Sequence, residues 1–437
     1  MQRFRVIRYA ATLGVLAVAA AACGSAQSSS PSTDVAAQES ASADSSPTTE
    51  PATTEADAPA PTVETRSSDA AAAPETTTIT TTTTTIATTT IAPRVYDFAD
   101  VSAIVETYVA EQGLSGAGLI IVERDDGVVH EEYWGDFDAD RVSLIASSGK
   151  MIAAGVLMSL DDQGILDVDA PVADVAEWGA SHPTITPAQL LSNSSGLIGL
   201  EDGFAFESYH CWFIPDVTLQ DCAEQVFTTP DDDAETIEPD TEFRYGGAQW
   251  TAAGAVAEAA SGRAWARLVD EMIATPCGLE SVGFNNRVGF DYPADFDGDP
   301  AVLSPTDNPS PGAGAFSNAP DYAQLMLMQL RGGMCGDEQV LSADAVEAML
   351  ADRIGEVYGG DTAGDSTGPD MNGYGLGWWV ERDSGRCIAF GGFGATPMLD
   401  PDNGFGVYIV TESNGETGRG IALQIYDPIE AAVLAAR

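Results

Sequence analysis

The chain has 437 residues and a formal net charge of −49, with 67 acidic residues against 18 basic ones. A chain of this length can hold two or three average domains, or one large catalytic domain with extensions. Because binding to phosphate backbones needs a basic surface, we expect no nucleic-acid partner. The excess of acidic residues fits a protein that works at high salt or beside an acidic cell wall. It also fits a lineage bias in codon usage, and the sequence does not decide between these explanations.

Residues 1–23 have the pattern of an export signal. Three arginines precede a short apolar run that ends at Ala22, and Cys23 follows it. The run is too short to span a bilayer comfortably, and it resembles a bacterial lipoprotein signal with Cys23 as the lipidated residue. Ordinary cleavage and secretion is the alternative. We therefore expect an exported protein held at the extracytoplasmic face of the cell membrane by its lipid, or else secreted.

Residues 24–94 are rich in Ser, Thr, Ala, Pro and Glu, and contain few large apolar side chains. Such a segment cannot bury enough surface to fold, so we expect a disordered linker that holds a folded domain away from the membrane. The folded domain is expected over residues 95–437.

Within this domain, periodicity predicts a helix over 100–109, a buried strand over 116–123, and a hairpin into a strand over 128–135. A long apolar helix then begins at Ser147 and ends at Gly164. Shorter helical segments are expected at 170–177, 186–192, 250–261, 264–274, 319–331 and 342–350, with an aromatic, acidic insertion over 198–241. Strands at 375–381, 386–390, 395–400 and 404–410 and a helix over 428–436 close the chain. Strands at both ends predict an α/β (α+β) fold, with one antiparallel sheet built from the N- and C-terminal segments, flanked by helices and carrying an inserted helical subdomain.

The apolar helix opens with the tetrad Ser147-Ser148-Gly149-Lys150. Ser147 and Lys150 are three residues apart, so they project from one face of a first helical turn, where backbone N–H groups favour developing negative charge. Lys150 is the only lysine of the chain. A lysine amine can accept a proton, whereas arginine cannot. A short pattern of this kind also arises by chance, with Ser147 a simple N-cap, but the single lysine favours a nucleophile beside its base.

Five cysteines follow Cys23, and their odd number leaves at least one thiol free or paired outside the chain. Cys211 and Cys222 lie in the same insertion, so we expect them to pair. Cys335 can pair with Cys277 or with Cys387. No spacing of Cys or His is typical of zinc, and we expect neither a metal nor an organic cofactor.

Five further motifs follow the tetrad in order: Gly164-Ile165-Leu166-Asp167, Leu190-Leu191-Ser192-Asn193-Ser194-Ser195-Gly196-Leu197, Arg244-Tyr245-Gly246-Gly247, Gly373-Tyr374-Gly375-Leu376-Gly377 and Phe390-Gly391-Gly392-Phe393. Over about residues 96–437 this order resembles the serine β-lactamase and penicillin-binding-protein superfamily, in its class C or esterase-like branch. Each motif alone would be a weak signal, and six in order are a strong one.

The resemblance implies roles for individual residues. Ser147 would be the nucleophile, with Lys150 and Tyr245 as its acid–base pair, and the sequence leaves open which of the two takes the proton. A buried core tyrosine is the alternative for Tyr245. The backbone N–H groups of Ser147 and Phe393 would form the oxyanion hole.

The substrate-binding positions depart from the family pattern. Phe390-Gly391-Gly392 stands where penicillin-recognising members have Lys-Thr-Gly or a triad that begins with His, and Gly247 stands where they have an asparagine that binds an amide. We expect these four residues to line the substrate site, beside an aromatic rim of Phe204, Phe206, Tyr209, Trp212 and Phe213. A site without the cation and the amide suits a neutral ester or amide better than a β-lactam.

The sequence thus predicts a monomeric serine hydrolase that cleaves an ester or amide bond, in a small molecule or a peptide, through a Ser147 acyl-enzyme. One alternative is a β-lactamase or D,D-carboxypeptidase. The other is a catalytically inactive module that binds the cell wall on a lipid tether.

Overall fold

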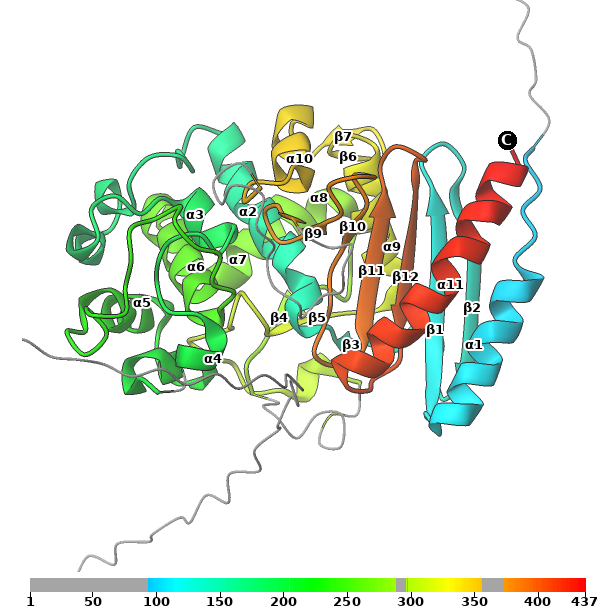
Figure 1. Ribbon diagram of the computed structural model, residues 1–437, viewed down its shortest axis with the longest axis horizontal. Helices are drawn as coiled ribbons and strands as arrows, with labels where there is room; N and C mark the ends of the chain where they lie inside the picture. The colour runs from blue at the N-terminus through cyan, green and yellow to red at the C-terminus, as the bar shows by residue number, and fades with distance from the viewer. Residues whose placement is uncertain (1–92, 204, 288–295, 297, 356–372) are drawn as a thin grey trace, which may run out of the picture. The chain divides into compact units, whose positions relative to one another are not determined.

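The computed structural model describes residues 93–437 apart from 204, 288–295, 297 and 356–372. The expected signal, Cys23, Phe204 and nearly all of the expected linker lie outside the described residues. The central feature is a seven-stranded sheet in the order β2-β1-β12-β11-β10-β9-β8 (Figure 1). Its strands are β1 (Gly116–Glu123), β2 (Gly127–Gly135), β8 (Gly373–Tyr374), β9 (Trp379–Val380), β10 (Cys387–Ile388), β11 (Ala395–Asp400) and β12 (Phe405–Val410).

The sheet joins the two ends of the domain, as the sequence predicts. β1 pairs antiparallel with β12, and Gly118 lies opposite Val410. β1 also pairs antiparallel with β2, and β12 with β11. The expected antiparallel sheet from N- and C-terminal segments is therefore confirmed.

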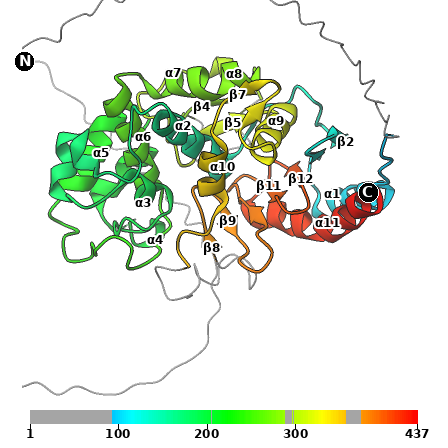
Figure 2. The same ribbon diagram turned by 90° about the horizontal axis from the view of Figure 1, so that it is seen from above.

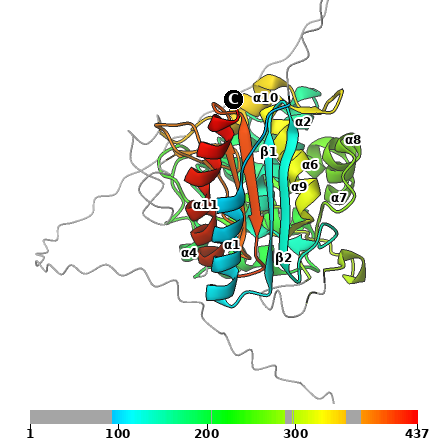
Figure 3. The ribbon, with the colours of Figure 1, turned by 90° about the vertical axis from the view of Figure 1, so that its right-hand side faces the viewer.

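Helices cover both faces of this sheet, so β1 is buried along its whole length. Ile120 and Val122 belong to the core on the side of α9 (Ala319–Leu330). Leu119 and Ile121 belong to the core under the helices α1 (Ala99–Gln112) and α11 (Gly415–Ala435). Figures 2 and 3 show α1 and α11 side by side on one face of the sheet and α9 on the other.

The helices α3 to α7 gather beyond the β8 edge of the sheet, and α2 runs beside α6 (Figure 1). The bounds in this region are α2 (Lys150–Asp162), α3 (Pro187–Leu191), α4 (Leu200–Gly203), α5 (Leu219–Thr228), α6 (Gly247–Ser261), α7 (Trp265–Val269), α8 (Thr275–Cys277) and α10 (Ala343–Leu350). Short strands β3 (Ser143–Leu144), β5 (Ala315–Ser317) and β4 (Gly283–Phe284) form a second sheet in that order, and β6 (Met334–Cys335) pairs with β7 (Glu338–Gln339). The helical subdomain predicted from the sequence is thus present.

Two disulfides cross-link elements of the domain. Cys211 pairs with Cys222, as expected, and Cys277 pairs with Cys335. Cys387 is a buried free thiol in β10, and its burial raises the pKa of the thiol. Among the residues that the structure describes, no helix combines the length and the apolarity that a membrane crossing requires.

Several predicted bounds are wrong. Ser147 lies in a 3-10 turn, Ala146–Gly149, and the α-helix begins only at Lys150. Of the strand expected over 375–381, only β9 (Trp379–Val380) forms, because Gly377 adopts a left-handed conformation, with φ of 91°, in the turn between β8 and β9. The last helix begins at Gly415 instead of 428, because its apolar residues pack on the sheet and extend it through an internal proline. The helix expected over 170–177 is only a 3-10 turn at Val172–Asp174.

Candidate active site

The turn that carries Ser147 is held from two sides. Ala146 has φ of 47°, a left-handed conformation that is uncommon for alanine and is frequent at functional sites. The Ser148 hydroxyl donates a hydrogen bond to the Ala395 carbonyl at 2.7 Å, and the Tyr322 hydroxyl donates one to the Ser148 carbonyl at 2.7 Å. β11 and α9 therefore fix the turn, and Ser147 itself stays half-buried in the 3-10 turn that precedes α2.

Lys150 projects from the first residue of α2 toward Ser147. Its side-chain nitrogen Nζ lies 3.0 Å from Ser147 Oγ and also donates a hydrogen bond to the Gly312 carbonyl. The residue is only 2% exposed. In the part of the chain that the structure describes, no carboxylate forms an ion pair with this amine. The amine is thus placed to exchange a proton with Ser147 through a single hydrogen bond.

Tyr245 approaches the same amine with its ring. Lys150 Nζ lies 4.9 Å from the centroid of the Tyr245 ring and 5.5 Å from that of Trp250. Tyr245 stacks on Trp379, with ring centroids 5.6 Å apart. Burial, and after it the neighbouring Tyr245, raises the pKa of the Tyr374 hydroxyl well above its ordinary value. The structure therefore brings the three predicted catalytic side chains together, with the contact between Lys150 and Tyr245 made through the aromatic face.

Asn193 holds the backbone on both sides of Tyr245. Its carbonyl accepts a hydrogen bond from the Arg244 N–H at 2.8 Å, and its Oδ1 accepts one from the Gly246 N–H at 3.2 Å. Asn193 is fully buried and adopts a left-handed φ of 55°, which asparagine tolerates better than most residues. Asn193 is therefore a positioning residue for Tyr245.

The segment before β11 passes directly over the nucleophile turn. A Cβ on Gly391 would collide with the Ile145 carbonyl oxygen, so only glycine allows this approach. Gly392 is exposed, and a Cβ there would find its nearest neighbour, the Ala146 side chain, at 4.0 Å. The Phe393 carbonyl accepts a hydrogen bond from the Ser413 N–H at 3.1 Å, which fixes the following turn. The oxyanion role of the Ser147 and Phe393 N–H groups stays a prediction, and this close approach is what it requires.

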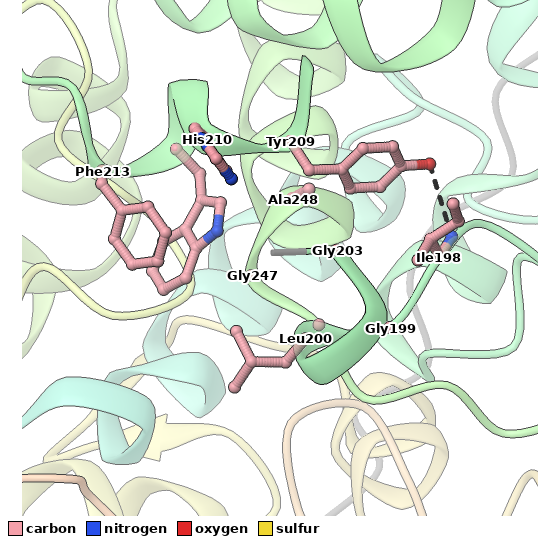
Figure 4. Close-up of a pocket in the computed structure, with 11 residues that line it drawn as sticks. Ile198, Gly199, Leu200, Gly203, Tyr209, His210, Phe213, Gly247 and Ala248 are labelled. Atoms are coloured by element: carbon pink, nitrogen blue, oxygen red, sulfur yellow. Dashed lines mark hydrogen bonds between the residues drawn. The ribbon is translucent and has the colours of Figure 1, made fainter. Parts of the chain in front are cut away.

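The side-chain position of Gly247 is occupied by a neighbouring ring. A Cβ on this residue would lie 2.9 Å from the ring of Trp212. Figure 4 shows the surrounding space, with Tyr209, His210 and Phe213 on one side and Gly247 at the start of α6. The space measures about 10 Å³, room for about one water molecule. The Trp212 ring thus occupies the place that a side chain at position 247 would take, and the expectation that Gly247 contacts substrate stays a prediction.

Phe390 also faces another side chain. It packs against the core under α1 and α11, and the Arg419 guanidinium lies 5.1 Å from its ring centroid. Phe390 is not among the residues that line the cavity described next. The expectation that its side chain contacts substrate finds no support in this packing.

A cavity of about 140 Å³ lies beside the nucleophile turn. Residues from the turn, the insertion and the loop before β5 line it, among them Leu144, Ala146, Trp212, Phe213, Ser310 and Phe393. Two members of the expected aromatic rim, Trp212 and Phe213, thus lie at this cavity. Tyr209 instead donates a hydrogen bond to buried Asp232 at 2.7 Å, and Phe206 packs against the core.

Sequence reasoning missed two residues of the site. The segment of Gly312 has the Gly and Pro content of a turn, but nothing in it indicates that its carbonyl meets Lys150. Asn193 belongs to the motif over residues 190–197, and the tolerance of asparagine for left-handed φ is the signal that could have indicated a backbone role.

Comparison with known proteins agrees with this geometry. Residues 101–427 match the family described as Beta-lactamase. Penicillin-binding protein 4 of Amycolatopsis lactamdurans is 26% identical over 268 residues, which is 55% of this chain and 66% of that protein, so the match spans slightly less than two thirds of the relative.

Two solved structures show the same fold. EstCE1, a hydrolase with promiscuous acyltransferase activity, has a TM-score of 0.59 and 19% identity over 76% of this chain and 97% of its own. Unliganded simvastatin synthase (LovD) from Aspergillus terreus has a TM-score of 0.59 and 17% identity over 76% of this chain and 97% of its own. The chain belongs to the Beta-lactamase family, a group of serine hydrolases that includes penicillin-binding proteins, esterases and acyltransferases.

Proposed function

We propose that this protein is an exported serine hydrolase that cleaves a neutral ester or amide through an acyl-enzyme on Ser147. The observation that carries the proposal is the 3.0 Å contact between Lys150 Nζ and Ser147 Oγ, made by a lysine that is 2% exposed. A buried amine without a carboxylate partner among the described residues is suited to proton exchange and poorly suited to a structural ion pair.

The proposed reaction uses these groups in two halves. Ser147 Oγ attacks the substrate carbonyl carbon while its proton passes to Lys150 or, through that amine, to Tyr245. The carbonyl oxygen becomes an oxyanion that the N–H groups of Ser147 and Phe393 stabilise. The bond to the leaving group then breaks as the Lys150–Tyr245 pair returns the proton to it. Water attacks the acyl-enzyme in the same way, and the proton it loses restores the Ser147 hydroxyl.

The preference for neutral esters or amides rests on the departures from the family pattern. The Trp212 ring fills the place of the amide-binding asparagine, and Phe390 replaces the cation that would hold a substrate carboxylate. EstCE1 is described as a hydrolase with promiscuous acyltransferase activity, which is a reaction of the acyl-transfer kind proposed here. The likeness to Penicillin-binding protein 4 favours a D,D-carboxypeptidase as the second candidate.

A fluorophosphonate probe tests the nucleophile. The purified protein should be labelled, and the Ser147→Ala variant should not be. Ser115→Ala, which changes an exposed serine that precedes β1, is the matched control and should be labelled like the wild type. Failure of the wild type to react would favour the inactive binding module.

Substrate preference is tested with two chromogenic substrates on the same preparation. We expect a p-nitrophenyl ester to be hydrolysed with a higher kcat/KM than a chromogenic cephalosporin. The reverse order would favour the β-lactamase or D,D-carboxypeptidase alternative.

We also propose that Cys23 carries the lipid anchor and that the domain acts as a monomer, both from the sequence pattern alone. Radiolabelled fatty acid should enter the wild type and not Cys23→Ala, and that variant should move to the medium. Incorporation into Cys23→Ala would exclude this anchor. Sedimentation of the purified protein as a dimer would contradict the monomer.

A further inference from the structure

We infer that the cavity beside the nucleophile turn is the acyl pocket of this enzyme, and that it takes a compact acyl group whose oxygen accepts a hydrogen bond from Ser310. The inference rests on the proposed function, because only an acyl-transfer reaction gives the pocket an acyl group to bind. A cavity of about 150 Å³ holds one benzene molecule, so the cavity of about 140 Å³ fits about six non-hydrogen atoms.

The position of the cavity indicates which part of the substrate it receives, the acyl group or the leaving group. Ala146 and Phe393 line it, and these residues border the two N–H groups proposed to hold the oxyanion. Ser147 is not itself a lining residue, and its turn meets the cavity through Ala146; Tyr245, which belongs to the pair that protonates the leaving group, is not among the lining residues either. A substrate whose carbonyl oxygen lies between the two N–H groups therefore directs its acyl chain into the cavity and its leaving group toward Tyr245.

Ser310 is the feature that points to an oxygen on the acyl group. It lines the cavity, is 1% exposed, and its Oγ has no hydrogen-bond partner among the described residues. Buried hydroxyl groups are seldom left unsatisfied, because the loss of water is costly. The Ser310 Oγ is itself buried, so it reaches the cavity by rotation of its side chain, and a carbonyl, ether or hydroxyl oxygen of a bound substrate then accepts the missing hydrogen bond.

The backbone holds Ser310 in this place. Its φ is 55°, in the left-handed region, which is unfavourable for serine. The Ser310 N–H donates to Asn308 Oδ1 at 3.1 Å, and the Ser310 carbonyl accepts from the Gly314 N–H at 2.7 Å. Strain and an unsatisfied hydroxyl at one buried residue, next to the proposed oxyanion hole, are typical of a group kept for binding.

The other polar side chains of the cavity are already engaged. Asn285 donates its side-chain N–H to the Ser304 carbonyl at 3.1 Å, and Asn286 donates to the Trp212 carbonyl at 3.0 Å. Apolar side chains such as Leu144 and Phe213 make up most of the remaining wall. Ser310 is therefore the group that can distinguish an oxygen-bearing acyl chain from an alkyl chain of equal size.

Two isosteric esters test the inference. The p-nitrophenyl esters of 4-oxopentanoic acid and 4-methylpentanoic acid differ only by a carbonyl oxygen in place of a methyl group. The readout is the ratio of their kcat/KM values, in the wild type and in Ser310→Ala and Ser310→Gly. Glycine also removes the hydroxyl and relieves the left-handed strain, so this variant tests the hydroxyl even if the alanine variant folds poorly. Ser208→Ala removes another buried, unpartnered serine hydroxyl, from outside the cavity, and is the matched control.

We expect the ratio, 4-oxopentanoate over 4-methylpentanoate, to fall about 3- to 10-fold in both Ser310 variants, the worth of one hydrogen bond, and to stay unchanged in Ser208→Ala. An unchanged ratio in both Ser310 variants would overturn the inference, as would a dodecanoate ester cleaved as fast as the 4-methylpentanoate. Fluorophosphonate labelling separates the two levels of the proposal. A labelled enzyme with an unchanged ratio loses only the pocket assignment, whereas an unlabelled, inactive enzyme loses the proposed function and the pocket assignment together.

Discussion

The packing of Trp212 on Gly247 predicts a mutation whose effect on stability changes sign with its background. The change is Gly247→Ala, made once in the wild type and once in Trp212→Ala. Gly247 is the first residue of α6, and a Cβ there would lie 2.9 Å from three atoms of the Trp212 ring. In the wild type, the Trp212 ring must move to make room for the new methyl group. In the Trp212→Ala background the ring is missing, so the methyl group meets no obstacle there.

The change in the free energy of unfolding is the difference between a cost of overpacking and a gain in helix propensity. The Trp212 ring lies against Phe213, with centroids 3.6 Å apart, and Asn286 holds its backbone carbonyl, so it cannot move freely. Overpacking of this kind costs about 1–3 kcal/mol. Replacing glycine by alanine in a helix gains about 0.5–1 kcal/mol. Gly247→Ala should thus destabilise the wild type by roughly 0.5–2 kcal/mol and stabilise Trp212→Ala by roughly 0.5–1 kcal/mol.

The assay is urea unfolding followed by far-UV circular dichroism, with the free energy of unfolding taken by linear extrapolation. The two single variants and the double variant form a cycle whose coupling energy should be about 1–3 kcal/mol. Gly155→Ala, at a helical glycine of α2, is the control and should have the same effect in both backgrounds. Equal destabilisation by Gly247→Ala in both backgrounds would refute the account of Trp212 as the group that fills this place.

Three further predictions follow from contacts of the site and the surface. Lys150→Arg keeps a long basic side chain but removes the proton acceptor, so kcat/KM for a p-nitrophenyl ester should fall about 100- to 10,000-fold. Gly391→Ala pushes the segment before β11 off the Ile145 carbonyl, so the protein should lose about 1–3 kcal/mol in urea unfolding and most of its kcat. The Arg287 guanidinium lowers the pKa of the Asp216 carboxyl, so this pair contributes stability above the unfolded pKa of about 3.9 and loses it as the pH falls through the lower folded value. Asp216→Asn should therefore reduce the loss of urea stability between pH 5 and pH 3, by a small amount because the pair is exposed.

Each of these has an outcome that contradicts it. Retention of full activity in Lys150→Arg would exclude the lysine as a proton acceptor. A Gly391→Ala variant with wild-type stability and kcat would show that the segment before β11 does not need its close approach to the nucleophile turn. An Asp216→Asn variant that loses stability in acid as steeply as the wild type would show that the ion pair with Arg287 does not contribute to folding.

The sequence by itself determined those features that depend on neighbouring residues. The strands over 116–123 and 395–400 have the predicted bounds, because a run of apolar residues bounded by polar ones is a local signal. The spacing of Ser147 and Lys150 predicted their contact, since three residues span about one helical turn whether it is 3-10 or α. The order of the motifs was enough to indicate the family, and the strands predicted at both ends of the domain indicated the sheet that joins them.

Only the tertiary structure decided what surrounds these residues. Trp212 fills the space beside Gly247, the Gly312 carbonyl meets Lys150, and Asn193 holds the backbone around Tyr245. These partners are separated by 35 residues, by 162 and by about 50, so no local periodicity connects them. Packing of distant segments also extended the last helix back to Gly415, against the local signal of its internal proline. Local patterns therefore placed the reacting groups, whereas long-range packing determined the shape of the pocket beside them.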